Sequence, residues 1–152
     1  MSLISEILPI DNIVLDNHSA TKQAIFERAG LLFANKLGLP QASIVDSLLQ
    51  REKLGSTGLG RGVAIPHGRI ARMREATAAF IKLSHGVPFD APDRQPVQLV
   101  FVLLVPDRAT DLHLQILGEL AEMFSDSAFR QQLLDCTDVP TLHRLMTGWR
   151  GA

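Results

Sequence analysis

Hydrophobic residues recur with a helical period through most of the first third of the chain. A short apolar run at residues 13–15 lies between polar, turn-forming residues and predicts a brief strand. From Ser19 to Gly38 the apolar side chains return every three or four positions, which predicts an amphipathic helix with Ser19 as its N-cap and Gly38 as its stop. A second stripe predicts a helix with Pro40 in its first turn and an end near Leu54. One strand followed by two helices is therefore expected here.

The remainder of the chain alternates between strand-like and helix-like patterns. Residues 63–65 and 77–84 have strand-like apolar patterns, and residues 97–105 are almost continuously apolar, as expected of a central strand covered on both faces. Helices must supply that cover, and three helical stripes follow at residues 110–124, 127–136 and 139–146. The order of elements predicts an α/β fold, a three-layer α/β/α sandwich in which helices flank a mixed β-sheet.

Composition limits the number of domains and the class of partner. The 152 residues are 46% apolar and 20% charged, which is typical of a globular chain that folds without disulfides or metals. No internal repeat or linker-like stretch divides the sequence, so we expect one domain over residues 1–152. Fifteen basic and sixteen acidic residues leave a net charge of -1 with no basic cluster, which disfavours nucleic acid as a partner.

The cysteine count and the absence of a long apolar segment indicate a compartment. Cys136 is the single cysteine and cannot form an intramolecular disulfide, and residues 1–6 lack the basic start and apolar core of a signal peptide. The longest apolar run, residues 99–105, is far shorter than the roughly 20 residues of a membrane helix. We expect a cytoplasmic protein with no membrane insertion.

Two histidines follow strands that we expect to run in the same direction. If the strands at 63–65, 77–84 and 97–105 run up, down and up, the first and third end at the same edge of the sheet, where open α/β sheets usually bind ligands. His67 follows the first strand, and His113 lies in the first turn of the helix after the third. On that condition the two imidazoles meet. An imidazole is a competent nucleophile near neutral pH, because its ordinary pKa of ~6.5 leaves one nitrogen unprotonated much of the time.

Groups suited to an anion surround His67 in the sequence. Residues 55–62 contain four glycines, whose backbone N–H groups no side chain obstructs. The side chains of Arg51, Ser56 and Thr57 are further donors, and the first turn of the helix with His113 adds unpaired N–H groups. This set suits a phosphoryl group, whose transfer depends mainly on positioning and on stabilisation of charge.

Each of these features also has a purely structural interpretation. Glycine-rich turns before strands are common, and this one lacks the Gly-Lys-Ser/Thr of a Walker loop. His113 shares a stripe with apolar residues and also fits a hydrogen-bonded core histidine, while His67 after Pro66 also fits a simple strand end. No histidine or cysteine spacing is typical of a zinc site, and we expect neither a metal nor a cofactor.

One long motif resembles a known family. The segment Arg51–Arg69, REKLGSTGLGRGVAIPHGR, strongly resembles the IIA proteins of the bacterial phosphoenolpyruvate:sugar phosphotransferase system, fructose/mannitol type. The resemblance extends over nearly the whole chain and includes residues 96–106 and 112–114. Within the family, residues 55–58 and 66–69 look most like the nitrogen-regulatory branch, PtsN or IIA-Ntr.

The resemblance implies roles for individual residues and for a partner. It implies that His67 is phosphorylated, that His113 is the second active-site histidine, and that the phosphoryl group is held with help from Arg51, Ser56, Thr57 and Gly58. The implied donor is a small histidine phosphocarrier, HPr or NPr, charged by an Enzyme I type kinase from phosphoenolpyruvate. The fold implied is again a three-layer one around a mixed sheet.

Three functions remain open at this point. The leading one is a regulatory phosphocarrier that controls partner proteins by its phosphorylation state, in this family typically linked to nitrogen and potassium metabolism. The second is a sugar-specific IIA component that passes phosphate to a IIB domain; the lack of any fused IIB, IIC or HPr segment favours the regulator. The third is a non-catalytic binding module, against which the intact His67 and His113 argue. The regulatory target and the oligomeric state are not fixed by the sequence.

Overall fold

A computed structural model describes residues 3–108 and 110–149. Within these ranges six strands form one sheet, and their bounds are β1 (Ile13–Asn17), β2 (Gly58–Gly60), β3 (Val63–Ala64), β4 (His67–Ile70), β5 (Thr77–Val87) and β6 (Val97–Pro106). The helices are α1 (Leu3–Ile7), the 3₁₀ turn η1 (Ile10–Asn12), α2 (Lys22–Leu37), α3 (Gln41–Lys53), α4 (Thr110–Ser125), α5 (Ser127–Asp135) and α6 (Val139–Gly148).

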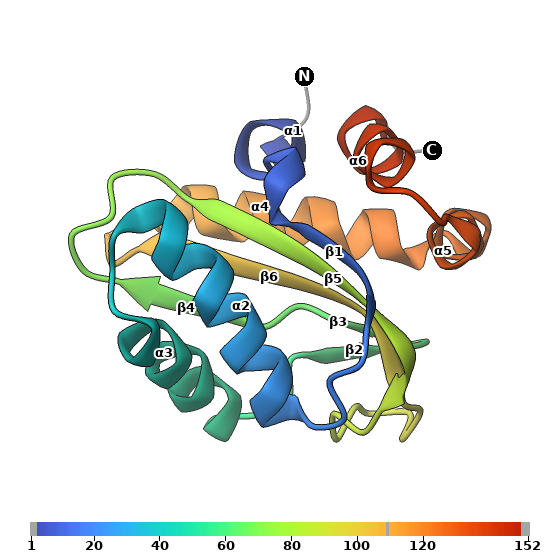
Figure 1. Ribbon diagram of the computed structural model, residues 1–152, viewed down its shortest axis with the longest axis horizontal. Helices are drawn as coiled ribbons and strands as arrows, with labels where there is room; N and C mark the ends of the chain where they lie inside the picture. The colour runs from blue at the N-terminus through green and yellow to red at the C-terminus, as the bar shows by residue number, and fades with distance from the viewer. Residues whose placement is uncertain (1–2, 109, 150–152) are drawn as a thin grey trace.

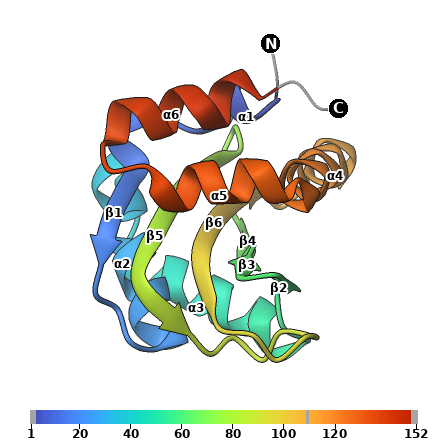
Figure 2. The ribbon, with the colours of Figure 1, turned by 90° about the vertical axis from the view of Figure 1, so that its right-hand side faces the viewer.

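The sheet is mixed and lies between two layers of helices. Its strand order is β1-β5-β6-β3-β2, and β4 also pairs with β6. Strand β5 runs antiparallel to β6, whereas β3 and β4 run parallel to β6. Helices α2 and α3 cover one face, and α1, α4, α5 and α6 cover the other (Figures 1 and 2). The three-layer α/β/α prediction and the relative directions predicted for the three strands are confirmed.

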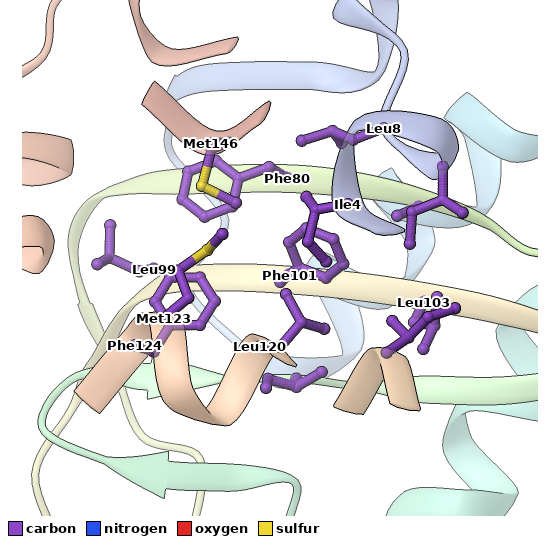
Figure 3. Close-up of a cluster of buried hydrophobic side chains, with 14 of the residues drawn as sticks. Ile4, Leu8, Phe80, Leu99, Phe101, Leu103, Leu120, Met123, Phe124 and Met146 are labelled. Carbon is purple, nitrogen blue, oxygen red and sulfur yellow. The ribbon is translucent and has the colours of Figure 1, made fainter. Parts of the chain in front are cut away.

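The two central strands supply alternate side chains to two separate cores. Phe80 and Phe101 face the layer of α1, α4 and α6, where Figure 3 shows them packed among helix side chains such as Met123. Ile81 and Val100 face α2 and α3. Because successive side chains of a strand point to opposite faces, a strand buried on both faces must be apolar at nearly every position. This explains the continuous apolar run of β6.

Three details of the predicted elements are wrong. The N-cap of α2 is Thr21, whose side chain accepts a hydrogen bond from the Ala24 N–H (3.1 Å), whereas the Ser19 N–H donates to the Asn17 side chain. Pro40 is the N-cap residue of α3 and not part of its first turn. The four glycines of residues 55–62 predict a loop or turn, but these residues contain β2, which forms a hairpin with β3. Gly60 ends β2 and Gly62 lies in the turn, with φ of 91° and 83°, which glycine adopts readily.

Lys82 is a buried cation that serves the end of a helix. It lies on β5 and is only 7% exposed. Its ammonium donates hydrogen bonds to the carbonyls of Leu133 (3.2 Å), Leu134 (2.9 Å) and Cys136 at the C-terminus of α5. Helix C-termini carry unpaired carbonyls and the negative end of the helix dipole, so a cation there is stabilising. This contact fastens α5 to the sheet.

We predict that Lys82→Met lowers the free energy of unfolding by about 1.5–3 kcal/mol, the range for hydrogen bonds to a charged group, because the substitution removes the charged donor that these carbonyls share. Urea unfolding followed by circular dichroism measures the change. The matched control is Lys36→Met, which removes an exposed ion pair with Asp11 and should cost no more than about 1 kcal/mol. Equal losses in the two variants would contradict this account of Lys82.

Candidate functional site

His67 lies where the strand pairing along one side of β6 is interrupted. Strands β3 and β4 both pair in parallel with β6, Val63 opposite Leu99 and His67 opposite Leu103, but Ile65 and Pro66 separate them. Proline has no backbone N–H and cannot donate to the ladder. The sequence predicts His67 just past a strand end; it is in fact the first residue of β4, the next strand along the same side of β6.

The hydrogen bonds of His67 define its tautomer. Its Nδ1 lies 3.0 Å from the carbonyl oxygen of Ile65, and its Nε2 lies 3.1 Å from Nε of Arg51. A carbonyl can only accept and a guanidinium can only donate, so Nδ1 carries the proton and Nε2 carries the lone pair. The nitrogen that remains basic is therefore the one that faces Arg51.

His113 lies against His67. The two ring centroids are 5.2 Å apart and the rings meet edge to face at 64°. His113 is 8% exposed, and its Nε2 is buried without a hydrogen-bond partner among the described residues. The alternative of a hydrogen-bonded core histidine is not supported at this nitrogen. A buried polar atom without a partner is costly unless something fills that role.

Burial and nearby positive groups favour the neutral form of both imidazoles. Burial lowers the pKa of His67, and the nearby Arg51 lowers it further, against the opposing effects of the Ile65 hydrogen bond and of Glu52. Burial also lowers the pKa of His113, with additional contributions from His67, Arg69 and Arg51. An unprotonated Nε2 on His67 therefore persists below the pH at which a free imidazole would be half protonated.

A hollow of about 500 Å³ opens beside the two histidines, and its lining consists of Ser47, Gln50, Arg51, Leu54, His67, Gly68, Arg69 and His113. Arg69 is a site residue that the sequence did not single out. It follows His67 by two positions on β4, so the two side chains share a face of the strand. This spacing of two residues could have indicated that Arg69 lies at the site. Its Nη1 donates to the carbonyl of Asp107 (3.0 Å). Two guanidinium groups therefore line the hollow.

The predicted loop residues direct their polar groups elsewhere. The Ser56 hydroxyl donates to the Phe89 carbonyl and accepts from the N–H of Gly58 (3.0 Å). The backbone N–H and the hydroxyl of Thr57 donate to Glu52 at 3.0 and 2.6 Å. Neither Ser56, Thr57 nor Gly58 is among the residues that line the hollow. The structure thus brings Arg51, His67 and His113 together and uses the loop donors inside the protein.

The glycine at position 58 has a packing reason. A Cβ atom there would lie 2.8 Å from the Cβ of Ala91 and 3.1 Å from its Cα, closer than carbon atoms normally approach. The absence of a side chain lets β2 approach residue 91, so the glycine does not by itself indicate an approaching phosphate.

Two negative findings apply to the described ranges. Residues 3–108 and 110–149 contain no group of three or more His, Cys, Asp or Glu side chains placed to hold a metal ion. None of the helices in these ranges has the length and apolarity needed to cross a membrane.

Comparison with known proteins adds a family to this geometry. The family described as "Phosphoenolpyruvate-dependent sugar phosphotransferase system, EIIA 2" matches residues 6–148. The "Nitrogen regulatory protein" of Escherichia coli K12 is 36% identical over 135 residues, which are 88% of this chain and 83% of that protein.

Two solved structures are similar over almost their full length. The nitrogen regulatory protein IIA-Ntr of Neisseria meningitidis is 49% identical, with a TM-score of 0.92 over 96% of this chain and 100% of that one. The E. coli mannitol IIA enzyme, solved in complex with phosphorylated IIB, is 25% identical, with a TM-score of 0.78 over 94% and 100% of the two chains. The chain thus belongs to the EIIA type-2 family of the phosphotransferase system, with the nitrogen-regulatory proteins among its relatives, as the motif around His67 predicted.

Proposed function

We propose that this protein is a phosphoryl carrier of a nitrogen-related phosphotransferase system that accepts a phosphoryl group on Nε2 of His67. The observation that carries the proposal is the pair of hydrogen bonds on His67, which leave a lone pair on Nε2 beside two arginines. The donor is a histidine phosphocarrier of the HPr or NPr type.

The transfer step balances without a metal or a cofactor. The lone pair on Nε2 forms a new bond to phosphorus while the P–N bond of the donor breaks, and that bond's electron pair returns to the donor imidazole. Each ring keeps the proton on its other nitrogen, which for His67 is Nδ1–H bonded to Ile65. No proton has to cross between the two proteins.

The groups around the hollow suit the charge of the phosphoryl group. Before transfer, Nε–H of Arg51 donates a hydrogen bond to the lone pair on Nε2 of His67. As phosphorus approaches, this bond has to break, and the same N–H can then donate to a phosphoryl oxygen. Arg69 lies on the same face of β4, and Nε2 of His113 has no partner of its own among the described residues. Donors already in place at the site of developing charge lower the barrier to transfer.

Exposed apolar side chains near the site support a protein, and not a metabolite, as the partner. Leu54 lines the hollow and is 85% exposed, and Leu112 and Leu114, the sequence neighbours of His113, are 40% and 67% exposed although they do not line the hollow. Exposed apolar side chains gathered at a polar site mark a contact surface for another protein. Phosphorylation would add about 1.5–2 negative charges at the centre of this surface, which gives a basis for controlling target proteins by phosphorylation state.

A sugar-specific role is the second candidate. The relative solved in complex with phosphorylated IIB is a mannitol IIA enzyme, so a protein of this fold can exchange phosphate with a IIB partner. Incubation of phosphorylated protein with purified IIB domains distinguishes the two: loss of label to a IIB domain at a catalytic rate supports the sugar-specific role.

We predict that phosphoenolpyruvate, an Enzyme I homologue and HPr or NPr together add one acid-labile, base-stable phosphate, the behaviour of a P–N bond. His67→Ala should abolish labelling, because the acceptor nitrogen is lost. Phosphopeptide mapping and intact-mass measurement check both points. An acid-stable adduct, or full labelling of the His67 variant, would reject the assignment.

A separate prediction concerns His113. Replacement by alanine should slow phosphoryl uptake by about 100- to 1000-fold without abolishing it, the usual effect of removing one donor that stabilises developing charge. Rapid-quench kinetics at equal folded concentration measure the rate. Labelling of His113 itself, or an unchanged rate in this variant, contradicts the role given to it.

The lowered pKa values predict a pH dependence of stability. As the pH falls through about 6.5, the unfolded chain binds protons at these two histidines before the folded chain does, so the free energy of unfolding decreases. Above that pH the two histidines do not lower the free energy of unfolding. The loss grows as the pH falls and is complete once the pH is below the folded pKa values. The double variant His67→Gln, His113→Gln should lose less stability between pH 7.5 and 5.5 than the wild type does in urea titrations. Parallel losses in the two proteins would contradict the lowered pKa values.

A further inference from the structure

The hydrogen bonds of His67 form part of a closed circuit. Arg51 Nε donates to Nε2 of His67, and Nδ1 of His67 donates to the carbonyl of Ile65. The N–H of Ile65 donates to the carbonyl of Thr57 (3.0 Å). The N–H and the hydroxyl of Thr57 donate to the two oxygens of Glu52, which is covalently next to Arg51. The hydrogen bonds therefore lead from Arg51 to Glu52, and the peptide bond between these two residues closes the circuit.

The carboxylate of Glu52 is the most firmly held group in this circuit. Its side chain is 6% exposed, and Oε2 also accepts from Nζ of Lys22 (2.8 Å) at the start of α2. Lys22 in turn lies over the ring of Phe89, 4.8 Å from its centre. A buried carboxylate with three donors is held firmly, because every alternative position would leave charge or donors unpaired.

The same turn also holds the other end of Arg51. Its Nη1 donates to the carbonyl of Gly55 (2.9 Å), three residues after Glu52 and two before Thr57. The guanidinium is therefore bonded to His67 on one side and to the turn at Gly55 on the other. Glu52 holds the end of that turn through its hydrogen bonds with Thr57. A displacement of Thr57 moves the Ile65 carbonyl and the Gly55 carbonyl together.

We propose that Glu52 and Thr57 are positioning residues for His67: they fix the Ile65 carbonyl that holds the proton on Nδ1 and the turn that holds Arg51, and so select Nε2 as the reactive nitrogen. This inference rests on the proposed function and extends it to two residues that do not line the hollow. It also gives Thr57 a role different from the direct phosphate contact that the sequence had indicated.

The test uses the full chain and two isosteric variants. Thr57→Val removes only the hydroxyl bond to Glu52, and Glu52→Gln removes the charge. Both should slow phosphoryl uptake by His67 by about 10- to 100-fold, the cost of a small misplacement at a reacting group. Both should also speed hydrogen exchange of His67 Nδ1–H, seen by NMR of the ¹⁵N-labelled protein, by about tenfold. Thr57→Ser keeps a hydroxyl and should restore both values.

The control separates positioning from stability. Lys82→Met removes a buried polar contact between β5 and α5, on the other face of the sheet from α3 and Glu52, so it should lower stability while leaving the exchange of Nδ1–H and the uptake rate of the folded protein unchanged. Thr57→Val with exchange and uptake within about twofold of wild type would overturn the proposal. So would equal effects in Lys82→Met, or a failure of Thr57→Ser to restore them.

The two readouts also distinguish this inference from the proposed function. Exchange of Nδ1–H is measured on the unphosphorylated protein and needs no donor. If the wild type takes up no phosphate while Thr57→Val still speeds exchange, the proposed function fails and the positioning role stands. If phosphate is taken up normally and exchange does not respond, the positioning role fails alone.

Discussion

Pro66 interrupts the strand pairing along one side of β6, and the site is built around that interruption. Residue 66 has no N–H to donate to β6, although its carbonyl still accepts from the Leu103 N–H (2.9 Å), and the pairing divides into β3 and β4. The Ile65 carbonyl at the break accepts from Nδ1 of His67, and His67 begins the next strand. The parallel pairing with β6 then brings His67 to the edge from which α4 carries His113. The Ile65 carbonyl and the Arg51 guanidinium thus determine which imidazole nitrogen is basic.

Burial and the positive charge at the site both favour phosphoryl transfer to a neutral histidine. Burial and nearby arginines lower the pKa of both imidazoles and so favour the neutral form, while the same arginines supply positive charge for an incoming phosphoryl group. A protonated His67 could not attack phosphorus, and a site without cations would not stabilise the product. The arrangement fits a group that must accept phosphate readily and release it again, which is the requirement for a carrier.

The sequence predicted elements whose patterns are long, and missed those that depend on distant pairing. The run at residues 97–105 predicted a doubly covered strand. Gly38 predicted the helix stop because glycine readily adopts the left-handed conformation that it has here. Strands β2 and β4 are too short to show a period. Ser19 and Thr21 are both good caps, and only backbone geometry distinguishes them. The circuit through Thr57 could not be predicted, because it requires the contact of residue 57 with both Glu52 and Ile65.

The position of phosphorus on the ring tests the central claim most directly. In the ¹⁵N-labelled, phosphorylated protein, the one-bond coupling between ³¹P and nitrogen identifies the bonded atom. The hydrogen bonds of His67 predict coupling to Nε2, with Nδ1 still protonated and bonded to Ile65. Coupling to Nδ1, or to a nitrogen of any other histidine, would contradict the account.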